Sequence, residues 1–370
     1  MGKLTVIDLF SGCGGLSEGF KNAKFKIILA NDNWGAVKET FEYNHPKTKL
    51  IIGDIKKIPS KKIMEEAGIR RGDVDVVVGG PPCQGFSLSG NRVIDDPRNH
   101  LVKEFIRVVK DLQPNWFVME NVIGILSLAK GEISKEIMYS FGKIGYEMRN
   151  FKILNATHYG VPQLRKRVFY IGNRIGVPVK FPIEKNFYIN GNGNNHNNQT
   201  NLLNLPPAVT VGDAISDLPS LNDESGEEVM DYPSLPKTEY QEDRRRSSKK
   251  LYNHVRSNHT EQTIKVINLV PEGGNWRDLP KEYQNIRSFS NTWRRLDSEY
   301  PSVTIDTGHR HHFHPTANRV PTVRESARIQ GFDDKFRFLS SRTHQFRMVG
   351  NAVPPLLAKS IAEMIKKYSK

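Results

Sequence analysis

The chain has 370 residues, of which 37% are hydrophobic and 25% charged, so it can bury a sizeable core and differs from disordered chains. Its net charge of +14, from 54 Lys and Arg against 40 Asp and Glu, favours a polyanionic partner, although a lysine-rich proteome gives the same charge without one. No apolar run approaches the roughly 18 residues that span a bilayer, and the N-terminus lacks a signal-peptide cleavage pattern.

Residues 1–172 alternate between short β-rich runs and longer amphipathic segments. We expect seven strands, at 4–9, 26–30, 50–52, 74–78, 116–119, 151–154 and 168–171. Helices are expected between them, at 16–22, 36–43, 101–111 and 133–144. This alternation predicts an α/β fold with a doubly wound, mostly parallel sheet that helices cover on both faces.

The character of the chain changes after residue 172. Residues 186–201 are rich in Asn and Gly and read as a flexible loop or insertion, and the chain stays polar and irregular to about residue 300. Residues 355–368 then form an amphipathic helix that we expect to pack on the first domain. The predicted domains are therefore 1–180 plus 341–370, and a smaller, loop-rich domain at 181–340.

A glycine-rich turn, DLFSGCGG, follows the first expected strand at residues 8–15. Its G-x-G-G spacing differs from the G-x-G-x-x-G of a dinucleotide site, which disfavours an NAD-linked oxidoreductase. Asp32 and Asp54 end the next two strands, where carboxylates can accept hydrogen bonds from ribose and from an adenine amino group. The turn therefore indicates an adenosine-containing cofactor, with ordinary turn glycines as the alternative. We expect Cys13 to fill space beside the cofactor.

The segment GGPPCQGFSLSG at residues 79–90 stops the fourth strand abruptly, because proline lacks an N–H and glycine permits sharp turns. Cys83 sits at the end of this stiff turn, where open α/β sheets bind their ligands. It is either a packing residue in a tight corner or a reactive thiol. With only two cysteines there is no disulfide framework, so we expect a reducing, cytoplasmic compartment.

Two further strand ends carry charged residues. Glu120 follows four apolar or aromatic residues, so we expect its carboxyl to be partly desolvated, which raises a carboxyl pKa. Arg165 and Arg167 alternate with Lys166 and are expected on one face, where guanidiniums can hold a base carbonyl, a phosphate or the carboxylate of Glu120. The alternatives are a carboxylate at a helix N-terminus and a solvated basic strand.

Seven short motifs occur in order between residues 8 and 355: DLFSGCGG, GDI, PPCQGFS, MENV, QLRKR, RESARIQGF and QFRMVGNAVPP. This ordered set resembles the cytosine-C5 DNA methyltransferase family, of the prokaryotic restriction-modification type, which has a Rossmann-like methyltransferase fold. Residues 181 to about 320 match no common pattern closely, and in the family that region carries target recognition.

The resemblance implies covalent catalysis on a cytosine that is flipped out of the duplex. Cys83 adds to C6, Glu120 hydrogen-bonds N3 and the exocyclic amino group, Arg165 holds O2, and Arg167 helps to fix the loop and the thiolate. C5 then takes the methyl of S-adenosylmethionine, leaving S-adenosylhomocysteine, and loss of the C5 proton releases Cys83.

The resemblance also implies a set of cofactor-binding positions: Phe10, Gly12, Gly14, Asp32, Asp54, Ile55, Pro82, Asn351 and Ala352. One departure from the family pattern concerns the adenine. Asn33 stands where many relatives stack an aromatic ring, and Trp34 comes one place later.

Residues 84–100 form a polar loop that is expected to close over the flipped base, the alternative being a mobile surface loop. The expected DNA contacts are Gln84, Ser87, Arg92, Arg98, Arg244 and Arg245, and the last two are otherwise solvated. Four histidines, at 309, 311, 312 and 314, match no zinc pattern, so no metal is expected.

The sequence thus predicts a monomeric, cytoplasmic enzyme that methylates double-stranded DNA, encoded beside a cognate restriction endonuclease. One alternative is the tRNA-methylating branch of the family, which usually has a shorter recognition region and a different residue where Gly85 stands. The other is a catalytically silent DNA-binding protein, which would be expected to lose Cys83 or Glu120.

Overall fold

The computed structural model describes residues 2–82, 100–148, 150–182, 206–222, 224–284, 292–308 and 311–369. The chain divides into two compact units. The first unit contains Met1–Asn155, Lys166–Ile183 and Leu357–Lys370, and the second contains Ala156–Arg165 and Glu184–Leu356. The limits expected from the sequence, 1–180 plus 341–370 and 181–340, divide the chain by function, and that division stays a prediction.

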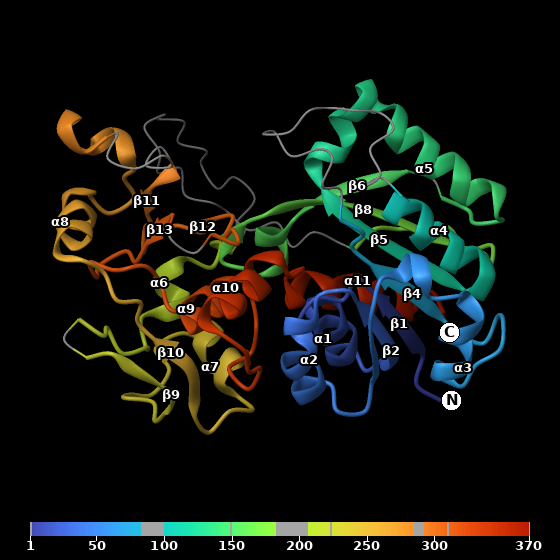
Figure 1. Cartoon of the computed structure of the whole chain (residues 1–370), viewed down its shortest axis with the longest axis horizontal. Helices are drawn as coiled ribbons and strands as arrows, with labels where there is room; N and C mark the ends of the chain where they lie inside the picture. Colours follow the sequence, from blue (N-terminus) through green and yellow to red (C-terminus); the bar gives the residue numbers. More distant parts are fainter. Residues whose placement is uncertain are drawn as a thin grey trace. The chain divides into compact units, whose positions relative to one another are not determined.

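The first unit is built on a seven-stranded sheet of order β3-β2-β1-β4-β5-β8-β6 (Figure 1). Strands β3, β2, β1, β4 and β5 pair in parallel, β8 runs antiparallel to β5, and β6 pairs antiparallel with β8 and so runs in the same direction as β5. The strands are β1 (Thr5–Leu9), β2 (Lys26–Asp32), β3 (Lys49–Ile52), β4 (Val76–Gly79), β5 (Trp116–Val122), β6 (Phe151–Asn155) and β8 (Lys166–Asn173). All seven expected strands are therefore confirmed, as is the mixed, mostly parallel α/β fold.

Helices cover both faces of this sheet. The helices are α1 (Gly15–Asn22), α2 (Lys38–Asn44), α3 (Ser60–Ala67), α4 (His100–Leu112), α5 (Glu132–Lys143) and α11 (Pro355–Tyr368). Apolar residues of α3, α4 and α5 share one buried cluster with the sheet. Figure 1 shows α1 and α2 on the other side of the strands from α4 and α5, and Lys366 of α11 donates to the carbonyl of Ala23 just after α1. Helix α3 was not expected from the sequence.

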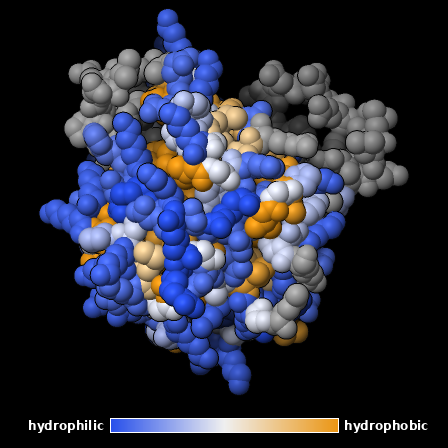
Figure 2. All heavy atoms as spheres, turned by 90° about the vertical axis from the view of Figure 1, so that its right-hand side faces the viewer, coloured by the Kyte–Doolittle hydropathy of each residue, from blue (hydrophilic) through white to orange (hydrophobic). Residues whose placement is uncertain are grey.

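The face of the first unit that Figure 2 shows is largely hydrophilic. Figure 2 shows hydrophobic side chains there in separate patches among hydrophilic ones. Among the described residues of this unit, Tyr139 is the most exposed large hydrophobic residue, at 63%. None of the described helices is both long and apolar enough to cross a membrane.

The second unit combines short helices with pairs of strands. Its helices are α6 (Val211–Ile215), α7 (Glu239–Arg245), α8 (Glu261–Leu269), α9 (Val323–Ile329) and α10 (Arg342–Asn351). Its two-stranded sheets are β9 (Gly226–Met230) with β10 (Leu251–Val255), β11 (Arg294–Arg295) with β13 (His312–Phe313), and β7 (Gln163–Leu164) with β12 (Ser302–Val303). One apolar cluster joins α6, β10 and α9, and a second lies around α8, Trp293 and Phe313.

Helix α9 is unusual because every residue from Val323 to Ile329 is buried although three of them are charged. Arg328 is the centre of a buried network: its Nε lies 2.6 Å from Asp334 Oδ1 and its Nη1 lies 3.0 Å from Asp217 Oδ1. Glu325 accepts two 2.7 Å hydrogen bonds from Arg319. Because buried charges cost little only when they are paired, these contacts are what allow the helix to be internal.

Candidate active site

The loops after β1 and β4 leave the sheet side by side. Both strands run parallel, and Leu9 at the end of β1 pairs with Gly79 at the end of β4. The strand order reverses between these two strands, since β2 and β3 lie beyond β1 while β5 lies beyond β4. Open α/β sheets bind ligands at the carboxyl ends of strands at such a switch point.

The glycine-rich turn after β1 has a backbone that favours glycine. Gly12 and Gly14 have φ values of 54° and 96°, and Phe10 also has a positive φ of 57°. A Cβ on Gly14 would lie 2.7 Å from His45 Nε2, whereas a Cβ on Gly12 would meet nothing within 4 Å. The turn is thus packed against α2 at Gly14 and open at Gly12.

Asp32 at the end of β2 is tied to this turn. Its Oδ2 accepts a 2.7 Å hydrogen bond from the Gly12 N–H, and its Oδ1 accepts one of 2.8 Å from the Trp34 N–H. The carboxylate expected to bind a ribose therefore also fixes the turn that precedes α1. Asp54 accepts from the Lys56 N–H at 3.1 Å, and Ile55 beside it is buried in the apolar core.

The turn has features that fit a polar cofactor such as one containing adenosine. Among the described residues, Ser11 Oγ and Asp8 Oδ1 are buried without a hydrogen-bond partner. Buried polar atoms of this kind usually have a partner in the working protein. Together with the open space at Gly12, they leave the turn able to accept hydrogen bonds from, or donate them to, a bound group.

Asp8 is fully buried, and burial raises the pKa of its carboxyl to about 7. The two hydrogen bonds that its Oδ2 accepts from Ser17, 2.6 Å from the hydroxyl and 3.2 Å from the N–H, oppose that rise but do not cancel it. From the sequence, Asp8 was recognised only as the first residue of the motif DLFSGCGG. Nothing in that motif indicates that its side chain is buried.

Cys13 is also buried, at 2% exposure. Burial raises the pKa of its thiol to about 12, so the nucleophilic thiolate is disfavoured. Both facts agree with the expectation that Cys13 fills space and does not react.

The backbone that leads to Cys83 is held by a residue that sequence reasoning missed. Residues 83–99 lie outside the described part of the chain, but Gly79, Gly80, Pro81 and Pro82 are described. Asn121, which is 3% exposed, donates from Nδ2 to the Pro81 carbonyl at 2.9 Å. This contact fixes the path of the chain two residues before Cys83, and the only sequence signal for it is the position of Asn121 beside Glu120.

Glu120 lies at the end of β5 and contacts both Arg167 and the same turn. Its Oε1 is 3.0 Å from Arg167 Nε, and both side chains are largely buried. A Cβ on Gly80 would lie 2.9 Å from Glu120 Oε2, so the carboxylate approaches the backbone of this turn closely and would have to shift for a larger residue. The structure therefore brings Glu120, Arg167 and the turn before Cys83 together.

Arg165, Asn351 and Ala352 belong to the second unit. Arg165 is 2% exposed, and it donates to the carbonyls of Ile305 at 3.1 Å and Gly350 at 2.8 Å. It thereby links the segment before β8 to the end of α10. Ala352 is buried and its carbonyl accepts from Gln330, whereas Asn351 is exposed.

The expected DNA contacts divide into two groups. Gln84, Ser87, Arg92 and Arg98 lie outside the described residues. Arg244 and Arg245 are described and are engaged in ion pairs: Arg244 with Asp333 at 2.8 Å and Arg245 with Asp217 at 3.0 Å. A contact of either arginine with DNA stays a prediction.

The histidine-rich segment has no metal-like cluster in the part that is described, from His311 onwards, and the same holds for the rest of the described chain. His311 pairs with Asp306 at 2.8 Å, and this hydrogen bond raises the His311 pKa. Burial lowers the pKa of His312 and of His314 to about 4, so both rings are neutral at pH 7.

Comparison with known proteins adds to this geometry. The profile of the family described as C-5 cytosine-specific DNA methylase matches residues 4–367. The chain is 38% identical over 396 residues to the Type II methyltransferase M.DdeI of Desulfomicrobium norvegicum, covering 99% of this chain and 89% of that protein. It is also 38% identical over 369 residues to the Type II methyltransferase M1.HphI of Haemophilus parahaemolyticus, covering 99% and 87%. A crystal structure from an E. coli prophage, assigned as a DNA modification methyltransferase, matches with a TM-score of 0.78 at 27% identity over 99% of each chain.

Proposed function

Because the chain belongs to the C-5 cytosine-specific DNA methylase family, we propose that it methylates C5 of cytosine in double-stranded DNA through a covalent bond from Cys83. The enzyme is a DNA (cytosine-5-)-methyltransferase, and its family uses S-adenosylmethionine as methyl donor. The observation that carries the assignment of residues is the Glu120–Arg167 pair, which lies against Gly80 three residues before Cys83.

When bound, S-adenosylmethionine supplies an electrophilic methyl group, and the turn after β1 is the proposed place for its adenosine. Gly12 leaves the room that the cofactor needs, Phe10 and Gly14 shape the turn, and Asp32 accepts from ribose hydroxyls. Asp54 and Ile55 contact the adenine, while Pro82, Asn351 and Ala352 complete the site. No metal takes part.

C5 of cytosine is a weak nucleophile, and the side chains of this site compensate for that. Addition of the Cys83 thiolate to C6 pushes electron density towards C5, which is the nature of covalent catalysis. Glu120 hydrogen-bonds N3 and the exocyclic amino group, and so offsets the negative charge that develops on the ring. Loss of the C5 proton after methylation then expels the thiol.

The two arginines have separate tasks in this proposal. Arg167 orients Glu120, which the 3.0 Å ion pair supports. Arg165 holds the O2 atom of the flipped cytosine, for which a guanidinium supplies charged N–H donors. The loop from Gln84, with Ser87, Arg92 and Arg98, closes over the base and contacts DNA together with Arg244 and Arg245.

We further propose that the enzyme is the monomeric modification partner of a restriction endonuclease and acts on DNA in the prokaryotic cytosol. The Type II names of relatives that match 99% of this chain support that role. Residues 181–340 are the proposed target recognition domain and residues 1–180 plus 341–370 the catalytic domain. The description of the family as a DNA methylase favours DNA over tRNA as substrate.

The test is Cys83→Ser, assayed with tritiated S-adenosylmethionine on unmethylated genomic DNA and in parallel on tRNA. We expect the wild type to label DNA at C5 and the variant to lose transfer while still binding S-adenosylhomocysteine. On DNA that contains 5-fluorocytosine, which cannot lose its C5 substituent as a proton, wild type and Cys13→Ala should form a covalent complex and Cys83→Ser should not. Robust methyl transfer by Cys83→Ser would exclude the covalent mechanism. Labelling of tRNA without labelling of DNA would exclude DNA as the substrate.

A further inference from the structure

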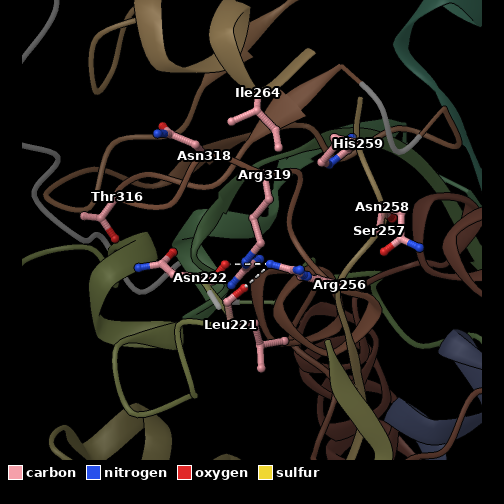
Figure 3. A pocket seen from close by; sticks show the side chains of 10 residues that line it. All are labelled: Leu221, Asn222, Arg256, Ser257, Asn258, His259, Ile264, Thr316, Asn318 and Arg319. Carbon is pink, nitrogen blue, oxygen red and sulfur yellow. Dashed lines mark hydrogen bonds between the residues drawn. The ribbon is translucent and has the colours of Figure 1, made fainter. Parts of the chain in front are cut away.

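The second unit contains a polar pocket that the proposed reaction does not use. It has a volume of about 420 Å³ and lies where three loops meet: the loop around Asn222, the loop from Arg256 to His259, and the loop from Thr316 to Arg319 (Figure 3). Small-molecule sites usually occupy roughly 300–1,000 Å³. The pocket is thus large enough for a ligand of nucleotide size.

Buried side chains hold the walls of this pocket in place. The Arg295 guanidinium, in a residue that is 5% exposed, donates to the carbonyls of Pro315 at 3.3 Å and of Ile267, and to Asn318 Oδ1 at 2.9 Å. Arg319 donates to the Ser220 carbonyl at 2.8 Å as well as to Glu325. These contacts tie the loops to α8 and α9, so the pocket is preformed.

Several polar side chains of the pocket are accessible to a ligand. The amides of Asn222 and Asn258 and the hydroxyl of Thr316 are exposed, and Ser257 and Arg256 are partly exposed. Nη1 of Arg256 is engaged, with the carbonyls of Leu221 at 3.3 Å and Asn222 at 2.6 Å. Figure 3 shows the guanidiniums of Arg256 and Arg319 close together at these carbonyls.

The charge and the hydrogen-bonding groups of the pocket indicate its ligand. None of the described residues that line it is acidic, and Arg319 is paired with Glu325, so Arg256 is the lining arginine that has no carboxylate partner among the described residues. A guanidinium can donate two parallel hydrogen bonds to two oxygens of one phosphate group. Amide side chains present one donor and one acceptor each, which is how proteins read the edges of bases.

We propose that this pocket binds a single nucleotide, with its phosphate on Arg256 and its base edge against Asn222 and Asn258. Ser257 and Thr316 supply further donors to the phosphate or the sugar. This second nucleotide site lies wholly within the second unit and does not depend on the methyl-transfer chemistry. The same chemistry fits a free mononucleotide and an unpaired nucleotide of DNA.

The experiment is calorimetric titration of the full chain with deoxyguanosine monophosphate, in the presence of saturating S-adenosylhomocysteine. The saturated cofactor site cannot then bind the nucleotide, and guanine is not the base that the reaction modifies. We expect one site, whose dissociation constant rises about ten- to a hundredfold in Arg256→Gln because a charge-assisted hydrogen bond is lost. Arg277→Gln, at an exposed arginine of the same unit outside the pocket, is the matched control and should bind like the wild type.

A second variant guards against a folding defect, since Arg256 also links two loops through its Nη1 atom. Asn258→Ala removes an exposed side chain without a partner among the described residues and should weaken binding about two- to tenfold. Failure of the nucleotide to bind the wild type, or equal binding by wild type and both pocket variants, would overturn the proposal. Displacement of the nucleotide by an equal concentration of inorganic phosphate would overturn the part of it that concerns the base.

The source of the nucleotide is decided by a third arm. A DNA hairpin with one unpaired guanine is titrated beside the same hairpin fully paired. Tighter binding of the first hairpin than of free deoxyguanosine monophosphate, lost in Arg256→Gln, identifies DNA as the source. Equal binding of both hairpins identifies the free nucleotide.

Discussion

Asp8 in the first unit and Glu325 in the second are both buried carboxyls, but their surroundings shift their pKa values in opposite directions. Asp8 has only Ser17 as a described partner, so desolvation dominates and its pKa rises to about 7. Burial would raise the pKa of Glu325 too, but the charge of Arg319 and the two 2.7 Å hydrogen bonds from it hold this pKa well below the usual range. Burial alone therefore does not determine the charge state of a carboxyl; a guanidinium in contact does.

The difference reflects what each unit does with its charges. In the second unit, the charged residues of α9 are buried where apolar residues would otherwise form the core, and each has an oppositely charged partner. In the first unit, the turn after β1 keeps Asp8 Oδ1 and Ser11 Oγ buried without a described partner, next to the proposed cofactor. Polar groups left unsatisfied in this way are common at functional sites and rare in purely structural ones.

The largest effect is expected from breaking the network around Arg328. The change Arg328→Met leaves Asp217 and Asp334 buried without their main cationic partner, which costs about 3–5 kcal/mol of unfolding free energy. Urea unfolding followed by tryptophan fluorescence measures the loss, since each unit contains tryptophan. A cost below about 1 kcal/mol would mean that the two carboxylates find other partners and that the network is not what holds α9 inside.

The next effect concerns Asp8 and its dependence on pH. The unfolded chain releases the Asp8 proton near its ordinary pKa of 3.8, whereas the folded chain keeps it until about pH 7, so this residue makes stability fall as pH rises between those values. Asp8→Asn should remove that fall and be more stable than the wild type at pH 8, by on the order of 1.4 kcal/mol for each pKa unit between folded and unfolded values. Unfolding midpoints at pH 4.5, 6 and 8 test it.

Glu325 provides the opposite sign in the same experiment. Its pKa is depressed, so the stability that it contributes is present above its ordinary value of 4.5 and is lost as pH falls below it. Glu325→Gln should therefore lose stability at pH 6 and change little at low pH. A parallel response of the two variants to pH would contradict the contrast between the two carboxyls.

These contrasts could not have been predicted from the sequence, although the sheet could. The strands were recognisable because runs such as 74–78 are apolar and β-branched and end at glycine or an acidic residue. Helix α3 was missed because it is only eight residues long and, of its apolar residues that pack on the core, Ile63 is buried whereas Met64 and Ala67 are only partly buried. Helix α9 has no amphipathic pattern at all, since its burial depends on Asp217, which lies 111 residues away from Arg328.

The candidate site was predictable to a similar extent. Glu120 and the two glycine-rich turns follow from strand ends, because the ends of neighbouring parallel strands meet at one edge of a sheet. Arg167 lies near the start of β8, which is antiparallel to β5 and therefore begins at the same edge. The Asn121–Pro81 contact depends on the register of β4 against β5, which sequence does not reveal. Likewise, a run of three arginines shows positive charge but not the carboxylates of Asp333 and Asp217 that engage the first two.

A smaller effect is expected at Gly14, where the turn packs against α2. Alanine there has an unfavourable φ of 96° and brings its Cβ to 2.7 Å from His45 Nε2, so Gly14→Ala should cost about 1–3 kcal/mol. Gly12→Ala is the matched control, because Gly12 also has a positive φ but open space around its Cβ position. Thermal unfolding of both variants measures the difference, and equal costs would mean that backbone strain alone acts and that the contact with His45 yields freely.

The smallest effect is expected at Arg246, the third residue of the arginine run. Its side chain is 74% exposed and pairs only with the half-exposed Asp243, three residues earlier in α7, and such surface pairs contribute about 0–1 kcal/mol. Arg246→Ala should therefore leave the urea midpoint almost unchanged, whereas Arg245→Ala, which leaves the buried Asp217 with one partner fewer, should lower it clearly.

DNA binding measured over a range of salt concentrations completes the comparison: if Arg246 contacts a phosphate, its loss reduces the slope of log K against log salt by about 0.9. An Arg246→Ala variant as unstable as Arg245→Ala would show that exposure does not separate the two arginines. An unchanged salt slope would mean that Arg246 is solvated and contacts no phosphate. Arg244 and Arg245 would then act through their ion pairs within the fold.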